Sequence, residues 1–334
     1  MTKKEEPAAP AKKGRVLEDV AIDYRNGNIP AWVQEVISTH LAIEVEDTKK
    51  AGALGFMSRA LVIATMPYKD PKSDVFKRQN GDFRLRIVAG YEGGVPYGIY
   101  PRLLMSWVAT EAVKKQSPEI VLGDSLSAFL RDVLELRSTG GGERGAASRV
   151  TEQMKRLFGS LITAQYTGTQ QHRGFQLRNV IIAEEVMIDE DEQDSLWLPQ
   201  DHNEAGKWKS KVRLTDSFFK DCISNPVPID LRAYKALRGS PLAMDVYAWL
   251  TYRMSYTERR SRPIPWEALM MQFGSNYGTN PEQAVRDFKK AFLKALKTVQ
   301  IVYPRASLEV TDNGLVLLPS PPHVLPKKGQ GDLF

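Results

Sequence analysis

The stretch of sequence that decides the fold runs from Val95 to Ile182. It begins with VPYGIYPRLLMSWVATEAVKK (95–115), which has a helical pattern. A short apolar run, EIVLG (119–123), and a second helical pattern, DSLSAFLRDVL (124–134), come next. A glycine-rich turn, STGGGERG (138–145), follows. We therefore expect a helix, a short strand and a helix before this turn.

The second part of the stretch is a basic helical pattern, AASRVTEQMKRLFGSLI (146–162). Two β-like runs close it, LITAQY (161–166) and FQLRNVIIAE (175–184), with the polar segment TGTQQHRG (167–174) between them. The order of helix, short strand, helix, turn, basic helix and hairpin predicts a winged helix-turn-helix. Such a module places one helix in a groove of DNA.

The same order of patterns recurs in the second half, without obvious identity between the residues of the two halves. Its segments are a long amphipathic helix (240–256), a short extended piece (262–266), a short helix (266–274), a turn (275–280), a basic helix (280–299) and a hairpin (301–320). The fold class is therefore expected to be α+β: two tandem winged helix-turn-helix domains, helix-rich and with β-hairpin wings.

Composition shifts divide the chain into five parts. These are a disordered basic arm (1–15), an N-terminal winged-helix domain (16–188), an acidic and polar linker (189–211), a C-terminal winged-helix domain (212–320) and a flexible tail (321–334). The linker is placed where seven acidic side chains gather between Glu184 and Asp194, because such a run repels itself and stays solvated.

The segment before Val95 has its own pattern. A helical pattern runs from Leu17 to about Leu54, with Val36 and Ile37 on its apolar stripe. Strands are expected in ALVIATMPY (60–68) and DFRLRIVAGY (82–91), with a loop-like segment between them.

The bulk properties suit a soluble DNA-binding protein. The formal net charge is +6 and the pI is about 9.2, which favours a polyanionic partner without proving one. A single cysteine, Cys222, excludes an internal disulfide and a cysteine-based zinc site and fits a reducing cytoplasm. No apolar run approaches the roughly 20 residues of a membrane span, and the N-terminus is not a signal peptide. We expect a cytoplasmic protein with no membrane partner.

The first basic helix can be divided by helical phase. Val150, Met154, Leu157, Phe158 and Leu161 form the apolar stripe, and Ser148, Arg149, Glu152, Gln153 and Arg156 are expected on the opposite face with Lys155 at its flank. Arg149 and Gln153 are the expected base contacts, since Arg suits guanine and Gln suits adenine. Lys155 and Arg156 are the expected phosphate contacts. An ordinary solvated helix face is the alternative.

The second basic helix carries more positive charge. Val285, Phe288, Phe292, Leu296 and Val299 form its apolar stripe, and Gln283, Arg286, Lys290, Lys294 and Lys297 are expected to bind DNA from the opposite face. A solvated lysine face is the common explanation for such a helix. Here no glutamates at i,i+4 spacing balance the cations, which weakens that explanation. In the first wing, His172 and Arg173 lie at the expected tip of the hairpin. Contact with DNA and a plain exposed loop are nearly even alternatives for these two residues.

No enzyme constellation can be recognised. The glycines at 140–145 lack the Gly-Lys-Ser/Thr end of a phosphate loop and follow a helix rather than a strand. The four histidines are scattered and none lies near the acidic run in a ligand pattern. We therefore expect no catalytic residues, no metal and no cofactor, and the protein is expected not to be an enzyme.

The last five residues read QGDLF, and they follow a Pro-rich stretch. This segment resembles the bacterial sliding-clamp-binding pentapeptide Gln-Leu-Ser/Asp-Leu-Phe, with Gln330, Asp332, Leu333 and Phe334 in matching positions. Gly331 stands where Leu is usual, which should weaken binding. A short peptide with two apolar residues at a free end suits a hydrophobic groove on a partner.

Longer strings resemble a known family. PYG-x-x-PRLL-x-x-W-x-x-TEAV in the first half and SPLA-x-D-x-Y-x-WL in the second are similar to the plasmid-encoded RepA replication initiators, and the resemblance covers roughly residues 60–319. It implies a protein that binds repeated sites (iterons) in double-stranded plasmid origin DNA. It also implies recruitment of the host replicative helicase and initiator, and self-association as a homodimer.

Two functions from different classes fit these residues. The favoured one is a plasmid replication initiator that binds iterons and recruits host replication proteins. The alternative is a winged-helix transcriptional repressor without an initiator role, and its own gene is among the targets that it could repress. The clamp-like peptide discriminates between them, because a plain repressor has no use for it.

Overall fold

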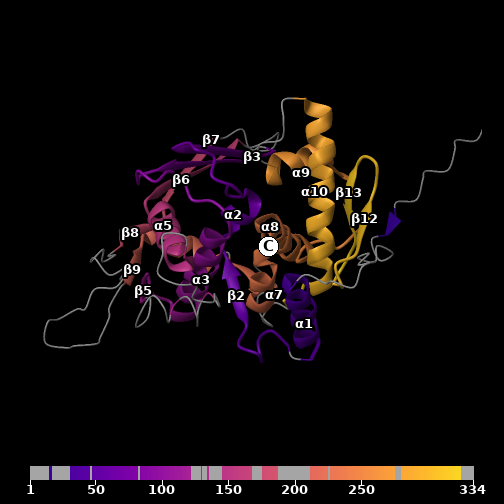
Figure 1. Cartoon of the computed structure of the whole chain (residues 1–334), viewed down its shortest axis with the longest axis horizontal. Helices are drawn as coiled ribbons and strands as arrows, with labels where there is room; N and C mark the ends of the chain where they lie inside the picture. Colours follow the sequence, from indigo (N-terminus) through magenta and orange to yellow (C-terminus); the bar gives the residue numbers. More distant parts are fainter. Residues whose placement is uncertain are drawn as a thin grey trace, which may run out of the picture.

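The computed structural model describes residues 15–16, 31–45, 47–81, 83–121, 129, 134, 145–167, 175–186, 211–224, 226–274 and 280–324. Within them, helices pack against four small antiparallel sheets (Figure 1). The mixed α+β class expected from the sequence is confirmed.

The first part of the chain supplies a helix and two hairpin strands. Its elements are β1 (Arg15–Val16), α1 (Ala31–Val45), β2 (Leu54–Met57), α2 (Arg59–Ile63), β3 (Val75–Asn80) and β4 (Phe83–Ala89). The strand expected over 82–91 is confirmed as β4. The strand expected over 60–68 is wrong, since the run contains α2, and β3 lies in the segment expected to be a loop. On α1, Val36 is fully buried whereas Ile37 is 36% exposed.

The stretch from Val95 to Ile182 contains the expected order in its described parts. Its elements are α3 (Ile99–Lys115), β5 (Glu119–Val121), α5 (Ala146–Phe158), β6 (Ser160–Thr167) and β7 (Phe175–Ile181), followed by β8 (Ala183–Val186). The hairpin β6–β7 does not stand alone, because β4 pairs along the other edge of β6. The result is a four-stranded sheet in the order β3-β4-β6-β7.

The segment after the expected linker joins the first half. Its elements are β9 (Lys211–Leu214), α6 (Asp216–Ser224), β10 (Val227–Asp230), α7 (Leu231–Ala236) and a 3-10 turn (Leu237–Gly239). β9 lies between β5 and β8, and β10 pairs with β2. Asp230 starts α7 as its N-cap, accepting hydrogen bonds from the backbone N–H groups of Arg232 and Ala233.

The last part forms a second helical unit with a hairpin. Its elements are α8 (Pro241–Met254), β11 (Ile264–Pro265), α9 (Trp266–Phe273), α10 (Pro281–Val302), β12 (Leu308–Val310) and β13 (Gly314–Leu317). The helices and the hairpin lie where the sequence predicted them. β11 pairs with β13, and β1 extends the same sheet beyond β12.

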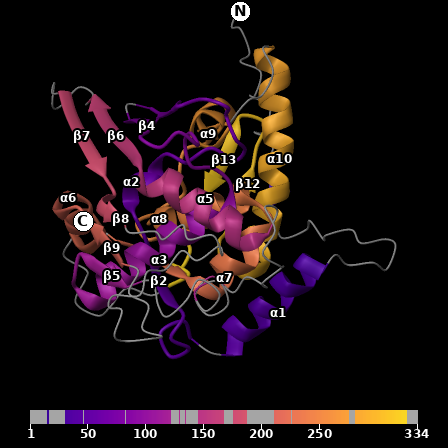
Figure 2. The ribbon, with the colours of Figure 1, turned by 60° about the vertical axis from the view of Figure 1, so that its left-hand side comes forward.

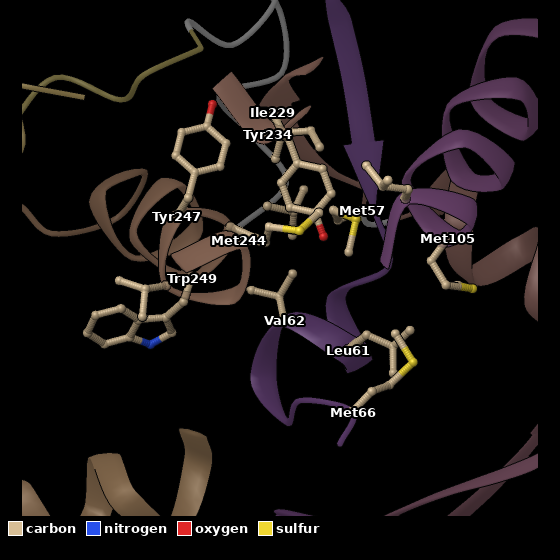
Figure 3. Packing of buried hydrophobic residues seen from close by; sticks show 14 of the residues in the cluster. Met57, Leu61, Val62, Met66, Met105, Ile229, Tyr234, Met244, Tyr247 and Trp249 are labelled. Carbon is tan, nitrogen blue, oxygen red and sulfur yellow. The ribbon is translucent and has the colours of Figure 1, made fainter. Parts of the chain in front are cut away.

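The core joins both halves of the chain. Figure 3 shows Met57, Leu61, Val62 and Met66 from the first half facing Tyr234, Met244 and other residues of the second. In Figure 1, α5 lies on one side of α8 and α10 lies on the other. The two basic helices are therefore separated by α8.

Candidate nucleic-acid interface

Helix α10 begins with a strong local signal. The Asn280 side chain accepts a hydrogen bond from the backbone N–H of Gln283 at 3.2 Å, and Pro281 occupies the first turn. Proline suits this position because its φ is already helical and its missing N–H would have no partner there. The 22 residues of the helix give a rod of about 33 Å at 1.5 Å per residue.

One face of α10 is held by aromatic packing. Phe288, Phe292, Leu296 and Val299 are fully buried, as predicted, whereas Val285 is only half-buried. The ring of Phe292 lies 5.5 Å from that of Phe273 and 6.3 Å from that of Trp266, both on α9. This packing fixes the direction of the opposite face.

The opposite face of α10 is polar and cationic. Its exposed residues include the predicted Gln283, Arg286, Lys290 and Lys294, beside the acidic Glu282 and Asp287. Lys297 is half-buried at the end of this face. The predicted residues therefore share one face, and we call Gln283, Arg286, Lys290, Lys294 and Lys297 the α10 stripe.

The α10 stripe is weakly paired within the protein. The expectation that no glutamate at i,i+4 spacing faces these cations is wrong for Arg286, which lies 3.7 Å from Glu282 one turn before it. Both side chains are largely exposed, so solvent screens the pair. Gln283 donates to Asp287 at 2.9 Å. Neither the Lys290 nor the Lys294 side chain makes a hydrogen bond or ion pair with any residue that the structure describes. The stripe can therefore offer its positive charge to an anion.

A β-hairpin lies beside α10 (Figure 1) and is tied to α9. The Trp266 indole N–H donates to the carbonyl oxygens of Thr311 and Asp312 at 3.2 and 3.1 Å. Next to the hairpin turn, a Cβ on Gly314 would meet the carbonyl oxygen of Ile264, so this close approach requires glycine. Lys289 lies 4.7 Å from the Trp266 ring and points towards α9 rather than along the α10 stripe.

Helix α5 also buries its predicted apolar stripe. Val150, Met154 and Leu157 are fully buried and Phe158 is 4% exposed. Leu161 belongs to β6, beyond the end of the helix. Arg149 is exposed on the outer side, and Ser148 is half-buried beside it.

The predicted position of Gln153 on the outer face of α5 is wrong. Gln153 is 4% exposed, and its side-chain oxygen accepts the backbone N–H of Tyr97 at 2.8 Å. The residue stands three positions after Val150, which places it on the buried side of the helix. Its role in this structure is to satisfy a backbone donor before α3.

The two expected phosphate contacts of α5 are partly covered. The Arg156 side chain is 11% exposed; its Nε lies 2.7 Å from Glu152 and its Nη1 lies 3.6 Å from Asp70. Its guanidinium also lies 5.1 Å from the Tyr97 ring centroid. Lys155 is half-buried, with Nζ 5.9 Å from the Tyr91 ring. Arg149 is the most open cation of α5.

Some predicted site residues lie outside the described residues. These are His172 and Arg173 of the first wing, and Gln330, Asp332, Leu333 and Phe334 of the terminal peptide. Their predicted contacts stay predictions.

Sequence reasoning missed a set of surface cations on the sheet β3-β4-β6-β7. Lys77, Arg84 and Arg86 are exposed on its outer face. The signal was present in FRLRIV (83–88), where charged and apolar residues alternate as in a half-buried strand. The same alternation that predicts a strand also places Arg84 and Arg86 together on its solvent-exposed side.

Three further observations concern other properties of the described residues. Among the described residues, no group of His, Cys, Asp and Glu side chains is arranged to hold a metal ion. In the same part of the chain, no helix has the length and apolarity needed to cross a bilayer. Cys222 is buried, which raises the pKa of its thiol above the ordinary value.

Comparison with known proteins gives a family and a few solved structures. Residues 95–267 match the model of a family described as plasmid encoded RepA protein. The crystal structure of RctB domains 2-3 is similar at 12% identity and a TM-score of 0.45, over 77% of this chain and 94% of that chain. A selenomethionine form of RctB domains 2 and 3 gives 11% identity and a TM-score of 0.47, over 78% and 98%. No curated protein matches the chain.

Proposed function

The chain belongs to the family of plasmid-encoded RepA proteins, and from this membership we propose that it initiates plasmid replication. In this proposal it binds directly repeated iterons in double-stranded origin DNA. It recruits the host initiator and replicative helicase without catalysing a reaction of its own. Binding energy then drives the bending or melting of neighbouring DNA.

The α10 stripe is the observation that carries this proposal. It is a row of four cations and one glutamine on a capped, firmly packed helix, and three of the cations are exposed. The side chains of Lys290 and Lys294 make no hydrogen bond or ion pair with the described part of the chain. Arg and Lys on one helix face neutralise phosphates and reach base edges in the major groove. We propose α10 as a recognition helix.

The elements around α10 support a winged-helix unit. α8, β11, α9, α10 and the hairpin β12–β13 follow one another in the winged-helix order, and β11 pairs with β13. In this interpretation α10 enters the major groove and the hairpin is the wing beside it.

The first half supports a second unit less directly. α3, β5, α5 and the hairpin β6–β7 follow the same order, but β5 pairs with β9 instead of with the hairpin. We propose α5 as the second recognition helix, with Arg149 as its base contact. Two helices that enter successive grooves would lengthen the site that one monomer reads and raise its specificity.

Footprinting of the DNA that flanks the coding region tests the proposal. We expect directly repeated protection of about one or two helical turns per repeat. Equal affinity for all duplexes would contradict iteron recognition. Metal-dependent cleavage of origin DNA by the pure protein would contradict the absence of enzymatic activity.

The terminal peptide is proposed to tether the sliding clamp and so to raise its concentration at the origin. Deletion of Leu333 and Phe334 should abolish capture of the clamp while footprints on origin DNA stay intact. Clamp capture that survives the deletion would remove the peptide from the mechanism. If this deletion stops plasmid replication but leaves repression of transcription intact, the result would support the initiator function over the repressor alternative.

A further inference from the structure

The outer face of the sheet β3-β4-β6-β7 has an unusual composition. The inner residues Leu85 and Ile87 of β4 are buried in the core, so Arg84 and Arg86, which alternate with them, point outward and are exposed. The four strands contain no Asp or Glu, and Lys77, Arg84 and Arg86 are exposed on the outer face. The other two cations, Arg78 and Arg178, stand in the row of the buried Leu85.

Strand register arranges the outer side chains in two rows. Lys77 of β3 stands opposite Arg86 of β4, which stands opposite Thr163 of β6. In the next row Gln79, Arg84 and Gln165 stand side by side in the same way. We call these six residues the sheet face. It combines three cations with side chains that can donate further hydrogen bonds.

The pairing of Lys77 with Arg86 does not help the fold. Like charges directly opposite each other on neighbouring strands are destabilising. The side chains of Lys77, Arg84 and Arg86 make no hydrogen bond or ion pair with any residue that the structure describes. An external anion would relieve the repulsion and satisfy the donors.

The sheet face and the α10 stripe lie at the same end of the molecule. In both views the sheet and the part of α10 next to α9 are uppermost (Figure 1 and Figure 2). α9 packs against both β3 and α10, so the two surfaces belong to one rigid assembly. A ligand long enough to pass α9 can reach both.

We propose that the sheet face binds the sugar-phosphate backbone of duplex DNA that flanks the site held by α10. This inference rests on the proposed function and extends it to a contact that reads no bases. The sheet face carries three cations and no acidic side chain, so its charge is complementary to that of phosphates. The six residues include no aromatic side chain on which an unpaired base could stack, which favours duplex over single-stranded DNA. A second copy packed symmetrically on this face would bring cations against cations.

The test neutralises the three cations in the full-length protein. The variant Lys77→Gln, Arg84→Gln, Arg86→Gln is compared with wild type on generic duplexes of about one and about four helical turns, across a salt series. On the long duplex, the slope of log K against log salt should fall by about 2 to 3 if all three cations meet phosphates. On the short duplex the two proteins should differ little.

Two other variants control this result. Lys50→Gln, Lys114→Gln, Lys220→Gln removes the same charge from exposed positions elsewhere and should leave the slope close to wild type. The single change Arg86→Glu puts a carboxylate opposite Lys77. It should raise the thermal midpoint of unfolding while lowering affinity for the long duplex, a combination that a purely structural role would not give.

The outcomes separate this inference from the proposed function. An unchanged slope in the sheet variant, with weaker binding when Lys290 and Lys294 are neutralised, would overturn the inference alone. Equal loss in the sheet variant and in the three-lysine control would also overturn it, since net charge would then be the cause. A change only in self-association would assign the face to a second copy. Failure of wild type to bind any duplex would instead overturn the proposed function.

Discussion

The guanidinium of Arg102 and the carboxylate of Asp245 form a two-point ion pair in the core, linking α3 of the first half to α8 of the second. Nε lies 2.9 Å from one carboxylate oxygen and Nη2 lies 2.7 Å from the other. Arg102 is fully buried and also donates to the carbonyl oxygens of Met66, Pro67 and Gly98. This pair fixes the helices that carry the two proposed DNA-binding units.

Breaking this pair from one side should be costly. Asp245→Asn leaves a buried guanidinium without its counter-charge and should lower the free energy of unfolding by about 3–5 kcal/mol. Arg102→Met with Asp245→Leu removes both charges and should lose less than either single change. Urea unfolding of the three variants measures this. A double variant that loses the sum of the single losses would show that the two residues are not coupled.

Neutralising the α10 stripe should weaken DNA binding through phosphates. Lys290→Gln with Lys294→Gln should reduce the slope of log K against log salt by about 2, since each neutralised phosphate adds about 0.9. Lys50→Gln with Lys220→Gln is the matched control, because it makes the same charge change at exposed positions elsewhere. The fold should be unaffected by both pairs. An unchanged slope would remove the two lysines from the interface.

Arg149 and Gln153 should behave differently, although they lie on one helix. Arg149→Ala should relax sequence preference by about 1–3 kcal/mol with little effect on stability, if the guanidinium reads a base. Gln153→Ala strands the N–H of Tyr97 and should lower stability by about 1–3 kcal/mol. Binding to iteron and unrelated duplexes, beside thermal unfolding, separates the two effects. Equal loss on all DNA with Arg149→Ala would indicate a phosphate contact instead.

His323 should make stability depend on pH. Its Nδ1 lies 2.7 Å from the Tyr247 hydroxyl, and burial lowers its pKa to about 4, although the charge of Asp230 partly opposes this. Between pH 6.5 and 4 the unfolded chain binds a proton that the native state does not. Stability contributed by the neutral ring is therefore present above the unfolded pKa and is lost as the pH falls through this window, by an amount on the order of 3 kcal/mol.

His323→Asn provides the control for this pH dependence. The amide can keep a hydrogen bond to Tyr247 but does not titrate, so the loss of stability between pH 6.5 and 4 should shrink. Thermal unfolding at several pH values measures the difference. Identical pH curves for the two proteins would show that other groups are responsible.

The sequence predicted α10 and its hairpin well because their signals are local. Asn280 and Pro281 mark the start of the helix, and its apolar spacing fixes the buried face. The run at 60–68 contains a helix and not the predicted strand, because a short apolar segment can form either when it is buried. Gln153 is polar and was therefore expected to face solvent, but its helical phase places it on the buried side of α5. The pairing of β2 with β10 joins residues far apart in the chain, and nothing local signals it.

The strand pairs that connect the two halves also affect how the chain folds during translation and how it responds to proteolysis. β2 leaves the ribosome long before β10, and β5 cannot gain its neighbour β9 until residues 211–214 have been synthesised. The first half is therefore expected to complete its fold late in translation, with its unpaired strand edges open until then. Cleavage between residues 187 and 210 should accordingly yield two fragments that remain associated, and that refold better together than apart.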